Sequence, residues 1–168
     1  MKQKWIEVGT IVNAHGVRGE VKLNPDGFDP AFIAAFDRLF IAGKETKVKA
    51  ARVHKSTVLL TLPGVEDMDA ALAMKGKRVS ICRDDASLPA GEYFDAELEG
   101  CGVEDAATGA MLGKITRVLT YPAHKVYEVK GEREYLIPAV PGVFIDGVDL
   151  EAGIVRVKMM KGLAVDED

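Results

Sequence analysis

The sequence predicts a mainly β protein built from two small β domains that are joined by a short linker. Segments of strand-like composition recur along nearly all of the 168 residues, at the short spacing typical of small barrels. Helical patterns are limited to brief segments. Near the middle of the chain, at residues 84–91, Pro and Gly interrupt both patterns, which indicates a domain boundary.

The first half contains six segments with the β-branched or alternating composition of strands. A loop with two glycines, Gly16 and Gly19, separates the first two of them. The predicted strands are Trp5–Val12, Glu20–Leu23, Arg38–Ala42, Lys47–His54, Thr57–Leu62 and Lys77–Cys82.

Two short helices are predicted between these strands. Asp29 and Pro30 begin the first, because Asp caps a helix N-terminus and Pro fits its first turn; this helix runs to about Phe36. The Ala-rich segment Glu66–Met74 predicts the second, which ends before Gly76.

Beyond residue 91 the strand pattern restarts and predicts a second small barrel. We predict a first domain over residues 1–83, the linker over residues 84–91, a second domain over residues 92–163 and an acidic tail over residues 164–168. The chain from Gly162 to Asp168 ends in Asp166-Glu167-Asp168, and we expect it to be frayed. The predicted strands are Gly102–Asp105, Leu112–Leu119, Lys125–Val129, Glu134–Ile137, Val143–Ile145 and Ile154–Lys158, with turns at Thr108-Gly109 and Gly131-Glu132.

Charge is divided unequally between the halves. Residues 1–83 contain 14 Lys and Arg against 9 Asp and Glu, a net +5, whereas residues 84–168 contain 8 against 17, a net −9. This asymmetry favours a phosphate-tolerant surface in the first half and a surface suited to a basic protein in the second. Solvated faces that differ by chance are the alternative.

The composition indicates an ordinary globular, cytoplasmic protein. Hydrophobic residues make up 48% and charged residues 29%, far from the signature of disorder. No apolar run approaches the roughly 18 residues of a membrane span. Cys82 and Cys101 lie outside any metal or redox motif, so we expect reduced thiols rather than a disulfide.

The sequence predicts no catalytic site, metal site or cofactor. The histidines His15, His54 and His124 are scattered without metal-ligand spacing. Nucleophile elbows, phosphate loops and dinucleotide fingerprints are absent. The carboxylate pairs, such as Glu66-Asp67 and Asp84-Asp85, are adjacent in sequence and would point to opposite faces of a strand, which does not suit an acid/base dyad.

One loop is a candidate contact to nucleic acid. Gly16 and Gly19, beside Arg18 and Lys22, would let backbone N–H groups approach a phosphate. The spacing formally satisfies the GXXG clamp of KH-type RNA binders, but that clamp joins helices and this loop joins strands. Two interpretations stay open: a tight turn only, or a turn that also contacts a partner through His15, Arg18 and Lys22.

The second candidate is the aromatic pair Tyr93-Phe94, which follows the linker. Neighbouring residues of an extended segment cannot both enter one core, so one of the two rings is available as an interface anchor. Packing of both rings into a small barrel is the alternative.

Taken together, these motifs resemble those of the ribosome maturation factor RimM family. The resemblance covers nearly the whole chain, with the motifs in register. The residues that carry it are Val8-Gly9-Thr10-Ile11, His15-Gly16-Val17-Arg18-Gly19-Glu20-Val21-Lys22, Gly91-Glu92-Tyr93-Phe94 with Leu98, Gly100 and Val103, Gly113-Lys114, Leu136-Ile137-Pro138, Val148-Asp149-Leu150 and Ile154.

The resemblance implies a fold and a function. The implied fold is a six-stranded, translation-protein-like barrel followed by a PRC-barrel domain. The implied function is accessory: late maturation of the head of the small ribosomal subunit and support of 16S rRNA processing, without catalysis. The implied partners are the free small subunit and its nineteenth ribosomal protein, bound mainly through the PRC-barrel domain. We expect a monomer.

The family's aromatic pair falls on Tyr93 and Phe94. The chain departs from the family pattern at this point, since the pair is usually Tyr-Tyr, an aromatic often stands where Asp95 does, and Asp is usual at Glu97. If the third aromatic supplies contact area in relatives, this chain must obtain that area elsewhere. An enzyme and a plain RNA-binding module are the alternative functions: bound flavin or metal would favour the first, and tight, steeply salt-dependent binding to naked rRNA the second.

Overall fold

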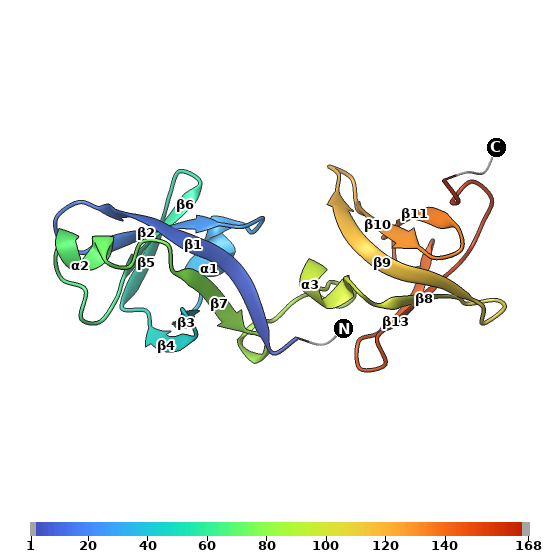
Figure 1. Ribbon diagram of the computed structural model, residues 1–168, viewed down its shortest axis with the longest axis horizontal. Coiled ribbons are helices and arrows are strands. Elements are labelled where there is room, and N and C mark those ends of the chain that lie inside the picture. Colours follow the sequence, from blue (N-terminus) through green and yellow to red (C-terminus); the bar gives the residue numbers. More distant parts are fainter. Residues whose placement is uncertain (1–2, 166–168) are drawn as a thin grey trace. The chain divides into compact units, whose positions relative to one another are not determined.

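The computed structural model describes residues 3–165 and is mainly β, as the sequence predicts. Within this range the chain forms thirteen strands, three short α-helices and one 3₁₀ helix (Figure 1). It divides into two compact units, Lys4–Ser87 and the residues from Leu88 onward. Each unit has its own sheet.

The first unit is a seven-stranded antiparallel sheet with the order β4-β3-β7-β1-β2-β6-β5. Buried residues alternate along several of its strands, as in Ile6 and Val8 or Val21 and Leu23, because side chains two apart point to the same face. The strands are β1 (Trp5–His15), β2 (Glu20–Pro25), β3 (Arg38–Ile41), β4 (Lys44–Lys47), β5 (Ala50–His54), β6 (Thr57–Thr61) and β7 (Arg78–Cys82).

The strand predicted over Lys47–His54 begins at the last residue of β4, breaks at residues 48 and 49, and continues as β5. This break shows how the two ends of the strand order are connected. Val48 N–H donates to the carbonyl of Asp37, before β3, whereas Lys49 N–H donates to Thr61 at the end of β6. The bent segment 44–54 therefore pairs with β3 through its first part and with β6 through its second part. It connects the two ends of the strand order. Counted as one bent strand, it gives the six strands that the family resemblance implies.

Both predicted helices of the first unit form, but each has only five residues. Helix α1 (Pro30–Ala34) is capped by Asp29, whose Oδ1 accepts a 2.9 Å hydrogen bond from Ala31 N–H. Helix α2 (Met68–Leu72) is capped in the same way by Asp67. Helix α1 packs against β5 and β6 and α2 against β1 and β2, so tertiary contacts stabilise elements too short to be stable alone.

The second unit is a six-stranded sheet with the order β11-β10-β9-β8-β13-β12, in which β13 and β8 form a parallel pair. Its apolar core includes Val103, Ile115, Val129, Ile137 and Val155. The strands are β8 (Gly102–Asp105), β9 (Met111–Thr120), β10 (Lys125–Lys130), β11 (Glu134–Pro138), β12 (Ile145–Asp149) and β13 (Ile154–Val157).

Two elements of this unit differ from the prediction. One brief helix was expected in this domain, but the sequence did not locate α3 (Asp95–Leu98), because four residues are too few to show a helical period. The strand predicted over Val143–Ile145 begins only at its last residue, since the N–H groups of Val143 and Phe144 both donate to Val140 and form a turn.

Regular structure extends into both the predicted linker and the predicted tail. Arg83–Asp85, at the start of the predicted linker, form a 3₁₀ helix (η1) that belongs to the first unit. In the predicted tail, Ala164 pairs with Tyr135 and Val165 N–H donates to Glu134, so the expected fraying does not hold for these two residues. Residues 166–168 lie outside the described residues. Cys82 and Cys101 are buried free thiols.

Candidate partner-binding surfaces

The Gly16–Gly19 segment is a four-residue turn between β1 and β2, whose last pair is His15 with Glu20. Both glycines have positive φ, +71° and +93°, which residues with a side chain rarely adopt. A Cβ on Gly19 would also lie 2.5 Å from the Val65 carbonyl oxygen, whereas one on Gly16 would meet nothing within 4 Å. A residue without a side chain is therefore required at Gly19 for two reasons, its positive φ and its close approach to the Val65 backbone.

The tip of this turn is solvent-exposed. Val17 is 72% exposed and Arg18 is exposed beside it. The turn therefore presents a cation at its tip while Gly19 holds its base against Val65.

His15 lies beside His54 rather than alone. Their ring centroids are 5.1 Å apart and the rings are tilted by 53°. His54 is the last residue of β5, and Thr57 of β6 pairs with it. The scattered histidines of the sequence did not reveal this pair, because the sequence does not give the register that brings β5 back toward the end of β1.

Three cations surround the histidine pair. In the sheet, Lys22 of β2 is opposite Leu59 of β6, and Leu59 is opposite Arg52 of β5, so the side chains of this row lie on the same face. Partial burial lowers the pKa of His54, and the positive charges of His15, Lys55, Arg52 and Lys22 lower it further. We call His15, Lys22, Arg52, His54 and Lys55 the histidine-lysine surface.

One carboxylate neutralises part of this surface. Glu20 accepts two hydrogen bonds from Arg52, at 3.1 Å to Nε and 2.9 Å to Nη2, and this pairing lowers the pKa of the Glu20 carboxyl. Lys22 and Lys55 have no ion-pair partner among the described residues. The Arg52 guanidinium is thus paired with Glu20, whereas the two lysines and the two histidines of this surface are available to bind an anion.

The aromatic pair of the second domain lies at the start of α3. Phe94 is buried, with 5% of its surface exposed, while Tyr93 is half-buried and packs against the core. Phe94 N–H donates to Glu97 Oε1 at 3.2 Å, and the Phe94 carbonyl accepts from Glu97 N–H at 2.9 Å. Glu97 is itself 1% exposed. Of the two rings, Tyr93 has the surface to offer a partner, and Phe94 fixes the start of the helix.

Asp95, where the family often has an aromatic, forms an ion pair between α3 and β10. Its Oδ1 lies 2.6 Å from Lys125 Nζ of β10. Burial raises the pKa of the neighbouring Tyr127 to about 12, and the charge of Asp95 and the nearby Tyr93 add to this. In sequence, Tyr93-Phe94 is therefore followed by an ion-paired carboxylate in place of a third aromatic.

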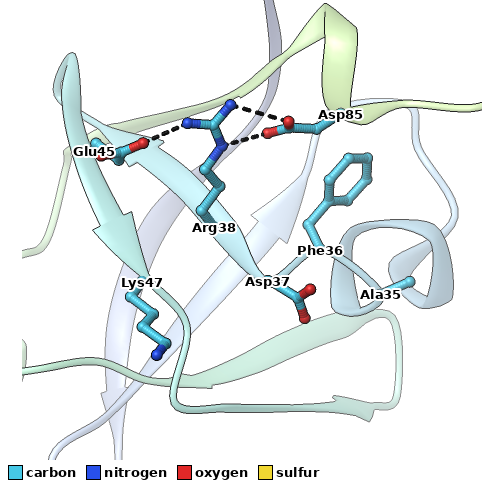
Figure 2. A pocket seen from close by; sticks show the side chains of 7 residues that line it. All are labelled: Ala35, Phe36, Asp37, Arg38, Glu45, Lys47 and Asp85. Carbon is cyan, nitrogen blue, oxygen red and sulfur yellow. Dashed lines mark hydrogen bonds and ion pairs between the residues drawn. The ribbon is translucent and has the colours of Figure 1, made fainter.

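An open pocket of about 690 Å³ lies in the first domain, and the arginine at its centre is already engaged in ion pairs. Figure 2 shows Arg38 at its centre, bonded to Glu45 on one side and to both oxygens of Asp85 on the other. These carboxylates use the guanidinium donors that an anionic ligand would need and raise the pKa of Arg38 further above its usual value. The ion pair between Arg38 and Asp85 holds the start of the predicted linker against β3. The sequence did not predict this contact, because it showed only a loss of periodicity from residue 84.

Two other kinds of site are absent from residues 3–165. Helices long and apolar enough to cross a membrane are not found in this range. Neither are groups of three or more His, Cys, Asp or Glu side chains placed to hold a metal ion.

Comparison with known proteins places both domains. The profile described as RimM N-terminal domain matches residues 6–86, and the profile described as RimM PRC barrel domain matches residues 95–163. The ribosome maturation factor RimM of Clostridium botulinum is 32% identical over 160 residues, which cover 95% of this chain and 96% of that protein. The chain belongs to the RimM family. The family resemblance predicted from the sequence is therefore confirmed.

Further RimM proteins are similar along most of their length. The ribosome maturation factor RimM of Geobacter metallireducens is 33% identical over 163 residues, 93% of each chain. A crystal structure of a 16S ribosomal RNA processing protein, RimM, from Pseudomonas aeruginosa is 29% identical, covers 93% of this chain and 98% of that chain, and has a TM-score of 0.45.

Proposed function

We propose that this protein is a cytoplasmic ribosome maturation factor that supports 16S rRNA processing and late assembly of the head of the small ribosomal subunit. The observation that carries the proposal is the match of both RimM domains, in order, over residues 6–86 and 95–163. The relatives that share this organisation are called ribosome maturation factors. We further propose that it acts as a monomer, without a cofactor, and catalyses no bond change.

In this proposal the second domain binds the nineteenth protein of the free small subunit. Charge supports the assignment, because residues 84–168 carry a net −9 and ribosomal proteins are generally basic. Within the sheet, one half has more acidic than basic side chains. Strands β8, β13 and β12 carry one cation, Arg156, against Glu104, Asp105, Asp146 and Asp149.

Tyr93 and Phe94 are the proposed anchor for this protein partner. Tyr93 has exposed surface and a ring held from below by the core, which suits a contact that must bury area at little entropic cost. Phe94, being buried, supports the anchor by fixing the start of α3.

The first domain then lies near rRNA, with His15, Arg18 and Lys22 as proposed phosphate contacts. Its net charge of +5 supports this assignment, as does Lys22, for which the described residues offer no ion-pair partner. His54 and Lys55 extend the same surface beyond the residues that the sequence singled out.

Co-sedimentation tests the function as a whole. The protein should sediment with free small subunits and not with assembled ribosomes, because an assembly factor leaves when its site is complete. Equal sedimentation with both would count heavily against an assembly role.

A pull-down with the purified ribosomal protein tests the anchor. Tyr93→Ala should weaken capture of the ribosomal protein. Tyr121→Ala should not, because it removes the same kind of ring from another position of the same domain, where Tyr121 is 52% exposed. Circular dichroism confirms that both variants are folded. Equal capture by a folded Tyr93→Ala protein would show that the anchor assignment is wrong.

A further inference from the structure

A second surface of the first domain has the chemistry of a nucleotide site. A groove of about 270 Å³ lies between β4 and the segments that follow β6 and α2. Its lining combines apolar side chains with three lysines from two separate parts of the sequence. It is distinct from the histidine-lysine surface, with which it shares no lining residue.

The rim of the groove is cationic and unneutralised. Lys44 and Lys47 come from β4 and Lys77 from the residue before β7. None of the three ammonium groups has an ion-pair partner in the described part of the chain. Of the described residues that line the groove, Glu45 is the one carboxylate, and it is bonded to Arg38. An anion at the rim would therefore meet positive charge that nothing in this unit already cancels.

The inner lining of the groove is apolar and small. Ile41 and Leu62 are nearly fully buried there, and Val65 is half-buried beside them. A volume of 270 Å³ is below the range of about 300 to 1,000 Å³ typical of drug-sized ligands, so the groove accepts one compact group rather than a helix or a folded surface. Val65 also contacts Gly19, so the groove adjoins the turn that carries Arg18.

We infer that this groove takes one unpaired base of single-stranded RNA, with the flanking phosphates on Lys44, Lys47 and Lys77. A flat, largely apolar group between anions matches an apolar floor between cations, and bases are available in this way only where RNA is single-stranded. The inference rests on the proposed role in rRNA maturation and adds where, and which form of RNA, the first domain contacts.

Fluorescence anisotropy with a short labelled RNA tests the inference on the full chain. Three probes are compared: the single strand, the same strand in a duplex, and an abasic strand that keeps every phosphate. The single strand should bind most tightly, because the duplex cannot offer a base and the abasic strand has none. Equal affinity for the intact and abasic strands would overturn the base site and leave only a charged surface.

Two kinds of variant separate the rim from the floor. Removing the rim lysines together (Lys44→Ala, Lys47→Ala and Lys77→Ala) should reduce the salt dependence of single-strand binding by about 2 in log–log slope, at about 0.7 per phosphate contact. Thr46→Trp, which fills the groove from β4, should lower affinity for the intact strand to that of the abasic strand and leave the slope unchanged. Retained binding of the abasic strand shows that this variant is folded.

A triple variant of the second domain (Lys114→Ala, Lys130→Ala and Lys161→Ala) is the matched control, since it removes the same charge from a different unit. A loss of single-strand binding as large as that of the rim variant would contradict the site. Binding of labelled polyglutamate, with no binding of RNA, would instead assign the groove to an acidic protein segment and overturn the inference. Failure of the inference leaves co-sedimentation with free small subunits intact, whereas failure of the proposed function abolishes it.

Discussion

The two surfaces proposed to bind partners are built in opposite ways. In the first domain, Arg18 and Lys22 are long side chains on a turn and a strand whose core lies beneath them. In the second, Phe94 is itself buried and Tyr93 packs against the apolar core. The cationic surface can be stripped without disturbing the sheet, whereas the aromatic segment cannot. A loss of binding therefore has a different meaning in each domain.

The largest expected effect is that of Phe94→Ala on the second domain. Truncating a buried phenylalanine costs about 3–5 kcal/mol, and Phe94 is 5% exposed. Tyr93→Ala should cost clearly less, because that side chain is only half-buried. Urea unfolding of the two variants measures the difference. Similar free energies of unfolding for Phe94→Ala and the parent would remove the contrast between the domains.

The next effect concerns the turn that carries Arg18. Gly19→Ala should destabilise the first domain by about 1–3 kcal/mol, because it adds both a positive-φ penalty and a 2.5 Å approach to the Val65 carbonyl. Gly16→Ala is the matched control, with the φ penalty of about 1–2 kcal/mol and open space around its Cβ. Thermal unfolding compares them. If Gly16→Ala is the more damaging, contact with Val65 is not what fixes the turn.

The sequence predicted most elements of the fold and less of the proposed surfaces. Alternating apolar residues located most strands, as at Val21 and Leu23, because the period of two is a local property. The pairing of His15 with His54 and of Arg38 with Asp85 depends on strand register and on a 3₁₀ turn, which are properties of the whole sheet. Phe94 shows the limit most clearly: an aromatic pair predicts one buried ring and one available ring, and burial decides which is which.

A smaller effect is expected from the histidine-lysine surface. Lys22→Ala with Lys55→Ala should lower the salt dependence of rRNA binding by about 1–2 in slope, since each lysine is proposed to meet one phosphate. The free energy of unfolding should stay near that of the parent, because neither ammonium group is paired in the described structure. Filter binding across a salt series measures the slope. An unchanged slope would place the rRNA contact elsewhere on the first domain.

The smallest effect is a pH dependence located at His54. Its pKa in the folded protein lies below the ordinary value of 6.5, chiefly through burial and then through the cations around it. Below pH 6.5 the unfolded chain therefore binds more protons at this residue than the folded protein does. The contribution of His54 to stability is complete above pH 6.5, where the imidazole is neutral in both states, and is lost as the pH falls.

Melting temperatures of the parent and His54→Gln between about pH 7.5 and 5.5 isolate this contribution. The parent should lose more stability than the variant across the window. Glu20 does not interfere, since its pKa is lowered from 4.5 and its contribution is lost only at more acidic pH. A bound phosphate would reverse the sign for His54 by stabilising the imidazolium, so rRNA should flatten the difference between parent and variant. Identical pH profiles with and without rRNA would separate His54 from the proposed RNA contact and leave it a residue of the fold alone.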